Sequence, residues 1–216
     1  MDIPLSITLP WQQEQPAPAF TEDTDKFPES LPRYFIEKLA PQKNARIFDP
    51  FMGLGTTGFV AEELGRTPYG IEHDRMRCEW VAGQLEHWMN IQCDDAADMD
   101  KLGLPKMDLC VTSPPFMPKH HKWNPLYGGD PDYAGYDAYL KRMGFIFGKL
   151  AKQMKRNSFT VIHADNLTHG TVYTPLVRDL SLLMERFMAL KAEMIINWDN
   201  AKPDYPHTHC LVFKNA

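Results

Sequence analysis

The chain has 216 residues, of which 44% are hydrophobic, 12% aromatic and 24% charged. A chain of this length and composition is predicted to form one compact domain, which excludes a disordered, collagen-like or low-complexity protein. Its formal net charge of −5 excludes a uniformly basic nucleic-acid-binding protein but permits a local basic face.

An extended arm is predicted to precede a series of alternating helices and strands. Residues 1–26 are rich in proline and polar side chains, which favours an arm outside a domain at 27–216. After the arm, Leu31, Phe35 and Leu39 recur at helical spacing. Further helices are predicted at 56–65, 74–88, 135–156 and 172–190. Strands are predicted at 45–49, 68–72, 89–93, 107–112, 158–163, 193–198 and 208–213.

The alternation of strands with helices predicts an α/β fold with a parallel sheet covered by helices on both faces. The link between the last two strands, residues 199–206, is rich in turn residues and holds no helical pattern. These two strands are therefore expected to pair antiparallel. The sequence shows no internal repeat and no second domain.

The cysteines and the N-terminus indicate the setting of the protein. Cys78, Cys93, Cys110 and Cys210 form no Cys-x-x-Cys pair, which predicts reduced thiols. The first residues lack the basic start and apolar run of a signal peptide, and no apolar stretch approaches the ~18 residues of a membrane span. We therefore expect a soluble cytoplasmic protein without a membrane contact.

A glycine-rich loop follows the first predicted strand of the domain and opens a helix. Gly53, Gly55 and Gly58 spell Gly-x-Gly-x-x-Gly, which permits a tight turn and a close approach of backbone to a ligand. Glu72 ends the next strand, where it could accept hydrogen bonds from ribose hydroxyls. Asp49 before the glycines favours a cationic methionine group over a pyrophosphate, and hence S-adenosylmethionine over a nicotinamide cofactor. Glycines that merely turn the chain are the simpler alternative.

A Ser-Pro-Pro-Phe tetrapeptide, Ser113 to Phe116, follows the strand predicted at 107–112. In an open α/β sheet it would face the same crevice as the glycine loop. The prolines hold the backbone extended, so their carbonyls and the seryl hydroxyl could accept hydrogen bonds from a planar amino group. The phenylalanine ring could stack on an extruded base. A rigid turn at a strand end is the structural alternative.

A basic and aromatic loop follows the tetrapeptide, and such residues suit phosphate contact and base stacking. The candidate substrate-binding residues are Lys119, His120, His121, Lys122 and Trp123. A solvated loop is the alternative, and a solvated face is favoured for the six basic residues between Lys141 and Arg156. No metal site is expected at the histidines, which lack partners at metal-binding spacing. Asp165 and Asn166 end a strand at the crevice, where they could contact substrate or form a turn.

Together, the glycine loop and the tetrapeptide resemble those of the DNA amino-methyltransferases, the N4-cytosine and N6-adenine family. The resemblance covers roughly residues 27–213 and implies S-adenosylmethionine as cofactor. It also implies a single Rossmann-like methyltransferase domain whose seven-stranded, mostly parallel sheet has an antiparallel last strand. The initial serine of the tetrapeptide is more typical of cytosine N4 members than of adenine N6 members.

The resemblance further implies roles for individual residues. The segment before the first helix would help to form the wall at the methionine end, Glu72 would hold the ribose, and Asp95 would hold the adenine amino group. The implied cofactor-binding residues are Pro28, Ser30, Asp49, Pro50, Phe51, Gly53, Gly55, Thr56, Thr57, Glu72, His73, Asp94 and Asp95. The implied catalytic residues are Ser113, Pro114, Pro115 and Phe116.

One departure from the family concerns target recognition. Members that read a DNA sequence usually carry an added recognition region, whereas the one roomy insertion here is 117–136. DNA is the favoured substrate, and a separate specificity subunit is one way to supply recognition. Three alternatives stay open: the same chemistry on a structured RNA, a nicotinamide-dependent oxidoreductase, and a non-catalytic nucleic-acid-binding subunit.

Overall fold

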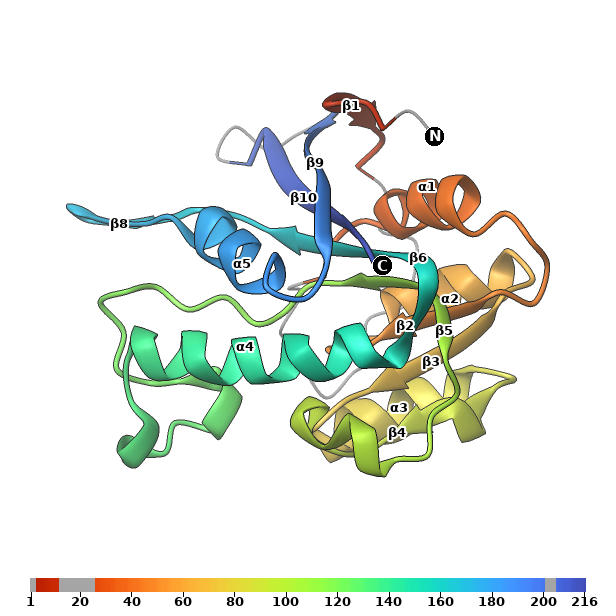
Figure 1. The fold of residues 1–216 in the computed structure, drawn as a ribbon, viewed down its shortest axis with the longest axis horizontal. Coiled ribbons are helices and arrows are strands. Elements are labelled where there is room, and N and C mark those ends of the chain that lie inside the picture. Colours follow the sequence, from red (N-terminus) through yellow and green to blue (C-terminus); the bar gives the residue numbers. More distant parts are fainter. Residues whose placement is uncertain (1–2, 12–25, 201–204) are drawn as a thin grey trace.

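Eight strands form the central sheet of the computed structural model, which describes residues 3–11, 26–200 and 205–216 (Figure 1). Their order is β1-β9-β10-β6-β5-β2-β3-β4, and β7 and β8 form a separate hairpin. The strands are β1 (Ser6–Leu9), β2 (Arg46–Asp49), β3 (Thr67–Ile71), β4 (Ile91–Gln92), β5 (Met107–Thr112), β6 (Met154–Ala164), β7 (Leu167–His169), β8 (Val172–Thr174), β9 (Ala189–Trp198) and β10 (His207–Lys214). The helices are α1 (Ser30–Leu39), α2 (Thr56–Glu63), α3 (Arg75–Gln84), α4 (Tyr136–Gln153) and α5 (Leu176–Met184). Short 3-10 helices lie at Trp88–Asn90, Ala96–Lys101, Pro125–Tyr127 and Pro131–Tyr133.

Helices pack on both faces of the sheet because consecutive residues of each central strand point to opposite sides. In β2, Ile47 belongs to the hydrophobic cluster beneath α1 and α2, whereas Phe48 belongs to the cluster beneath α4 and α5. Val161 and Ile162 of β6 divide in the same way. These strands are therefore buried on both faces, as parallel strands in α/β proteins are.

The predicted fold class is confirmed, with an antiparallel last strand. β10 pairs antiparallel with both β6 and β9, while β2, β3, β4, β5 and β6 pair in parallel. The sheet has one strand more than expected because β1, within the predicted arm, pairs in parallel with β9. Ile7 and Leu9 of β1 pack against the core and attach it to the sheet edge. Residues 12–25 of that arm lie outside the described residues.

The C-terminal helix is shorter than the sequence indicated. We expected a helix at 172–190, but its first residues form β8, which pairs with β7, and α5 begins only after Pro175. Val172 and Tyr173 are residues that strands favour, and Pro175 is tolerated at a helix start but not within one. Sequence reasoning therefore missed the hairpin β7–β8, because residues 172–174 were assigned to the predicted helix. None of the helices among the described residues has the length and apolar character to cross a membrane.

The expectation of reduced thiols is wrong for one pair of cysteines. Cys78 of α3 and Cys93, just after β4, form a disulfide with their Cα atoms 5.5 Å apart. Cys110 and Cys210 are free and buried. The two bonded residues are 15 positions apart in sequence, on a helix and beside a strand that the fold packs together, so no local spacing motif marked them.

The disulfide predicts a stability that depends on reductant. A bond that closes a loop of about 15 residues stabilises a folded chain by about 3 kcal/mol at 25 °C, because it restricts the unfolded ensemble. Urea unfolding with dithiothreitol should therefore give a free energy of unfolding lower by about 2–3 kcal/mol than without it. A Cys93→Ser variant should resemble the reduced protein and be insensitive to dithiothreitol; equal midpoints for the oxidised and reduced protein would exclude a stabilising bond.

Candidate active site

The carboxyl ends of two neighbouring strands bring the glycine loop and the tetrapeptide together. β2 and β5 are parallel partners, so Asp49 and Thr112 lie at the same edge of the sheet. The Thr112 hydroxyl donates to the Asp49 carboxylate at 2.6 Å. The Thr57 hydroxyl, at the start of α2, donates to the Val111 carbonyl at 3.2 Å. These contacts join the two motifs at one edge of the sheet.

Asp49 is a buried carboxylate held by neutral donors. It is 1% exposed, and besides Thr112 it accepts the Phe51 backbone N–H at 3.0 Å on the same oxygen, Oδ1. Burial raises the pKa of Asp49 to about 6, although the hydrogen bonds from Thr112 and Phe51 and the nearby Thr57 hydroxyl lower it, and the charge of Glu72 raises it further. Because the ionised form is poorly solvated, a cation would be stabilised beside this carboxylate.

The glycine loop is fixed by Glu72 and by two left-handed glycines. Gly53 has φ of 53°, and Gly55, immediately before α2, has φ of 81°, a conformation that favours glycine. The backbone N–H groups of Gly53 and Asp74 donate to the two carboxylate oxygens of Glu72 at 2.8 and 2.9 Å. Glu72 is thus a support for the loop. Each carboxylate oxygen has two lone pairs, so the Glu72 carboxylate can still accept a hydrogen bond from a ribose hydroxyl.

The remaining predicted cofactor-binding residues before and within the loop lie either between β2 and the start of α2 or at the start of α1. Pro50, Thr56 and Thr57 are buried in the turn that starts α2. Ser30, at the start of α1, donates its hydroxyl to the Pro10 carbonyl at 2.6 Å and so has a protein partner. Its neighbour Pro28 accepts the Leu31 N–H at 3.1 Å in the same helix start, and Phe51 packs at the edge of the core beneath α4 and α5.

Asp94 and Asp95 follow β4, on the far side of Glu72 in the strand order. Asp95 accepts the Ala97 N–H at 2.7 Å and pairs with Arg142 of α4 at 2.7 Å, while Asp94 is exposed. Both carboxylates lie just after the end of β4, and the contacts with Ala97 and Arg142 hold the Asp95 side chain in place. His73 lies 3.2 Å from Glu72, whose hydrogen bond raises the pKa of the imidazole.

The tetrapeptide is anchored to α4 through its second proline. The Tyr139 hydroxyl donates to the Pro115 carbonyl at 3.0 Å, so this carbonyl already has a protein donor. The Pro114 carbonyl is the better candidate acceptor for a substrate amino group. Phe116 is partly buried against the core, with its ring 5.8 Å from the imidazole of His163.

Sequence reasoning missed the group that contacts Ser113. The Ser113 hydroxyl lies 2.9 Å from Nδ1 of His163 in β6, a residue that belongs to neither motif. Thr208 and Tyr205 extend this contact to Asp165. The signal that could have found His163 is the pairing of β5 with β6, in which Thr112 lies opposite Ile162, so that Ser113 and His163 follow together.

The predicted substrate-binding loop contacts the β7–β8 hairpin. The His120 ring stacks on His169 at 4.2 Å between centroids and contacts the His121 ring edge-on at 4.5 Å. Trp123 is 59% exposed and Lys122 is exposed, so both are accessible to a partner. Within the described ranges, no group of three or more His, Cys, Asp or Glu side chains is arranged to hold a metal ion.

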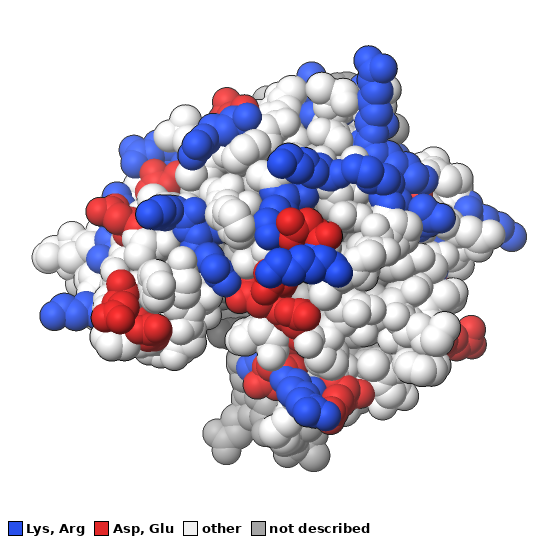
Figure 2. Space-filling model, turned by 60° about the horizontal axis from the view of Figure 1, so that its bottom comes forward, with Lys and Arg blue, Asp and Glu red and all other residues white. Residues whose placement is uncertain are grey.

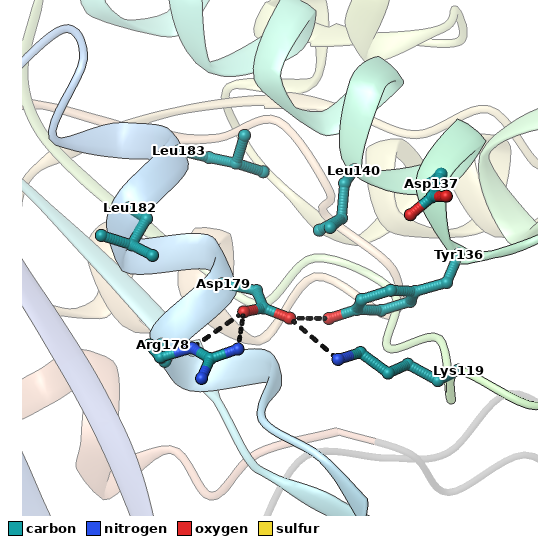
Figure 3. A pocket seen from close by; sticks show the side chains of 8 residues that line it. All are labelled: Lys119, Tyr136, Asp137, Leu140, Arg178, Asp179, Leu182 and Leu183. Carbon is teal, nitrogen blue, oxygen red and sulfur yellow. Dashed lines mark hydrogen bonds and ion pairs between the residues drawn. The ribbon is translucent and has the colours of Figure 1, made fainter.

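Lys119 lies apart from the tetrapeptide, beside a cavity of about 310 Å³ between α4 and α5. Figure 3 shows its ammonium group and Arg178 on either side of Asp179. The Asp179 carboxylate accepts the Tyr136 hydroxyl at 2.9 Å and lies 3.9 Å from the Lys119 ammonium. No residue of the glycine loop or of the tetrapeptide lines this cavity, and of the predicted substrate-binding residues it is Lys119 that does.

Some of the basic residues of α4 and of the start of β6 pair with carboxylates. Arg142 pairs with Asp95, Lys149 with Asp100 and Lys155 with Asp108, at 2.7, 2.6 and 2.6 Å. On the face drawn in Figure 2, Lys and Arg side chains are numerous, and Asp and Glu side chains lie among them.

Comparison with known proteins links the N-terminal part of the chain to one family. Residues 4–83 match the model of the N6/N4 DNA methylases, described as DNA methylase. The type II methyltransferase M2.LlaDCHI of Lactococcus lactis subsp. cremoris is 42% identical over 53 residues, which are 23% of this chain and 20% of that protein. The curated relatives are therefore matched over only about a fifth to a quarter of their length.

Solved structures share the fold at low sequence identity. TrmN from Thermus thermophilus has a TM-score of 0.62 at 15% identity, covering 88% of this chain and 49% of its own. SMU.1697c of Streptococcus mutans, whose structure holds SAH, has a TM-score of 0.55 at 13% identity, covering 88% of this chain and 98% of its own. The family match confirms the predicted resemblance to DNA amino-methyltransferases over residues 4–83, which do not include the tetrapeptide, and the solved structures confirm the predicted fold.

Proposed function

We propose that this relative of the N6/N4 DNA methylases is an S-adenosylmethionine-dependent methyltransferase that methylates the exocyclic amino group of a DNA base, with cytosine N4 as the target atom. The observation that carries the proposal is the Asp49–Thr112 hydrogen bond, which joins the glycine loop to the strand that ends in Ser-Pro-Pro-Phe. A site for a cationic cofactor and a site for an amino group then share one edge of the sheet.

The residues of the crevice fit S-adenosylmethionine, which when bound supplies an electrophilic methyl group on a sulfonium. Asp49, buried beside neutral donors, would stabilise the positive methionine end. Gly53 and Gly55 let the loop approach the cofactor closely, and Glu72 would accept hydrogen bonds from the ribose. Asp95 would accept the adenine amino group with the oxygen capacity that Arg142 and Ala97 leave.

The tetrapeptide would prepare the amino nitrogen for attack. Its lone pair is delocalised into the base ring, and accepting both N–H bonds draws the nitrogen toward a tetrahedral geometry. The Ser113 hydroxyl and the Pro114 carbonyl would supply these two acceptors, while the Phe116 ring stacks on the extruded base. Methyl transfer to this nitrogen would release the cofactor as a neutral thioether, S-adenosylhomocysteine, and the amino proton would then pass to solvent.

Cytosine N4 in DNA is favoured by two features. The family match is to DNA methylases, and the serine at the start of the tetrapeptide is the feature that favours cytosine over adenine. His120, His121, Lys122 and Trp123 would contact the nucleic acid from the loop, and a separate specificity subunit would contribute target recognition. Lys119, turned toward Asp179, would contribute through the neighbouring surface.

Radiolabelled methyl transfer to unmethylated DNA and to total RNA, followed by mass analysis of the nucleosides, tests the proposal. We expect N4-methylcytosine in DNA. N6-methyladenine in DNA would show that the target atom is adenine N6 and not cytosine N4. Label in RNA alone would show that the substrate is RNA and not DNA, with the same transfer chemistry. Cofactor binding with no transfer to either pool would overturn the enzyme and favour a non-catalytic nucleic-acid-binding subunit.

Cofactor affinity should depend on pH through Asp49. The pKa of this carboxyl is raised to about 6, so below that value the group is increasingly neutral and interacts less with a cationic ligand. The dissociation constant of S-adenosylmethionine should therefore be about tenfold larger at pH 5 than at pH 8. Isothermal titration calorimetry across this range measures the change, and a flat profile would separate Asp49 from the binding of the cation.

A further inference from the structure

A buried chain of hydrogen bonds runs from Ser113 away from the crevice. Nδ1 of His163 lies 2.9 Å from the Ser113 hydroxyl, and Nε2 lies 2.8 Å from the Thr208 hydroxyl. The Thr208 hydroxyl is 2.8 Å from both carboxylate oxygens of Asp165, and the Tyr205 hydroxyl donates to Asp165 at 2.6 Å. His163 is 6% exposed and Thr208 is fully buried.

Strand register brings these side chains together. β5 and β6 pair in parallel with Thr112 opposite Ile162, so Ser113 comes beside His163. β10 pairs antiparallel with β6 with Cys210 opposite His163, so Thr208 comes beside Asp165. The network therefore depends on three adjacent strands and has a fixed geometry.

The carboxylate determines the direction of every hydrogen bond in the chain. An ionised carboxylate only accepts, so Thr208 must donate its single hydroxyl proton to Asp165. The Thr208 oxygen is then the acceptor for Nε2–H of His163. A neutral imidazole that is protonated at Nε2 has its lone pair at Nδ1, so the Ser113 hydroxyl donates to His163.

We propose that His163 is a positioning residue that holds the Ser113 hydroxyl as a donor toward the imidazole, leaving the serine oxygen lone pairs for the substrate amino group. Asp165 and Thr208 hold the ring in the tautomer that this requires. The inference deepens the proposed function, on which its kinetic consequence rests. Without the imidazole acceptor, the serine hydroxyl could turn its proton toward the substrate and cease to be an acceptor there.

Protonation of His163 would reverse the arrangement, because an imidazolium has a proton on Nδ1 and must donate to Ser113. Burial lowers the pKa of His163, while the charge of Asp165 opposes this shift and that of His209 adds to it. The other polar groups around the ring are Ser113, Thr208, Tyr205 and the buried Cys210 thiol, and the rings of Phe27 and Phe116 lie 5.6 and 5.8 Å away. The neutral, competent form thus predominates at neutral pH, and acid should disable it.

The tautomer can be measured without any activity. In protein labelled with ¹⁵N-histidine, the ring nitrogens of His163 should report protonated Nε2 and unprotonated Nδ1 at neutral pH, with the signals assigned by their loss in His163→Asn. Thr208→Val, which removes the acceptor, should shift the ring toward the other tautomer, and Thr208→Ser should restore the wild-type shifts. A wild-type ring protonated at Nδ1 would overturn the inference, even if no methyl transfer is found.

Single-turnover rates at saturating cofactor test the consequence for the reaction. His163→Asn keeps an oxygen acceptor near the Nδ1 position but cannot be protonated, so its rate should be no more than about tenfold below wild type and should lose the decline of the wild-type rate in acid. His87→Asn removes a histidine outside this network, one that pairs with Glu62 at 2.6 Å, and should keep the wild-type profile. An acid decline that persists in His163→Asn would overturn the inference, whereas absence of transfer by the wild type would overturn the proposed function instead.

Discussion

Replacing Ser113 with alanine should lower the rate of methyl transfer by about 10- to 100-fold while leaving the dissociation constant of S-adenosylmethionine within about twofold of wild type. The hydroxyl is expected to contact the base and His163, not the cofactor. Its loss removes one of the two acceptors that hold the amino group, and it leaves the imidazole without its donor. Single-turnover transfer and calorimetry, made on the same preparation, separate the two quantities.

A matched control is available in α5. Ser181 donates its hydroxyl to Glu185 at 2.9 Å and belongs to neither motif, so Ser181→Ala should transfer methyl at the wild-type rate. If Ser113→Ala lowered cofactor affinity as much as it lowered transfer, Ser113 would contribute to the shape of the cofactor pocket rather than to the amino group. Wild-type transfer by Ser113→Ala would remove it from the site.

The predictable features of the site are those that local sequence records. Gly53 and Gly55 permit a turn that few other residues adopt, and Ser113 begins a tetrapeptide whose two prolines have no backbone donors. Both motifs stand where apolar runs end, so their common edge followed from the alternation of strands and helices. The structure adds the contact that joins them, the Thr112 hydroxyl on Asp49.

The features that were not predictable arise from packing between distant segments. Cys78 and Cys93 come within bonding distance because α3 packs beside β4, and their spacing in the sequence does not predict that contact. In the sequence, His163 is one residue of a predicted apolar strand. Only the register of β6 with β5 and β10 places it beside Ser113. The short strand β1 is stabilised by β9, which begins some 180 residues later, so local propensity alone favoured an arm.

Replacing Asp49 with asparagine should weaken S-adenosylmethionine binding by about 100-fold, because losing one charge of a desolvated pair costs about 2–5 kcal/mol. The substitution is nearly isosteric, and the amide oxygen can still accept from Thr112 and Phe51, which both donate to Oδ1. The pH dependence of binding should disappear in the same variant. Calorimetry at pH 5 and pH 8 measures both effects.

The same variant should be more stable than the wild type when no cofactor is present. The pKa of Asp49 is about 6 in the folded protein and about 3.8 unfolded, so ionisation destabilises the fold, with an upper bound of about 3 kcal/mol. The gain of Asp49→Asn should be full above about pH 6 and absent below about pH 4. Glu63→Gln, which removes an exposed carboxylate paired with Arg33 at the other end of α2, should change neither binding nor this pH profile. Loss of both cofactor affinity and stability in Asp49→Asn would indicate a disrupted loop. Weaker binding with a more stable fold is the expected result, because the buried carboxylate destabilises the fold and binds the cationic cofactor.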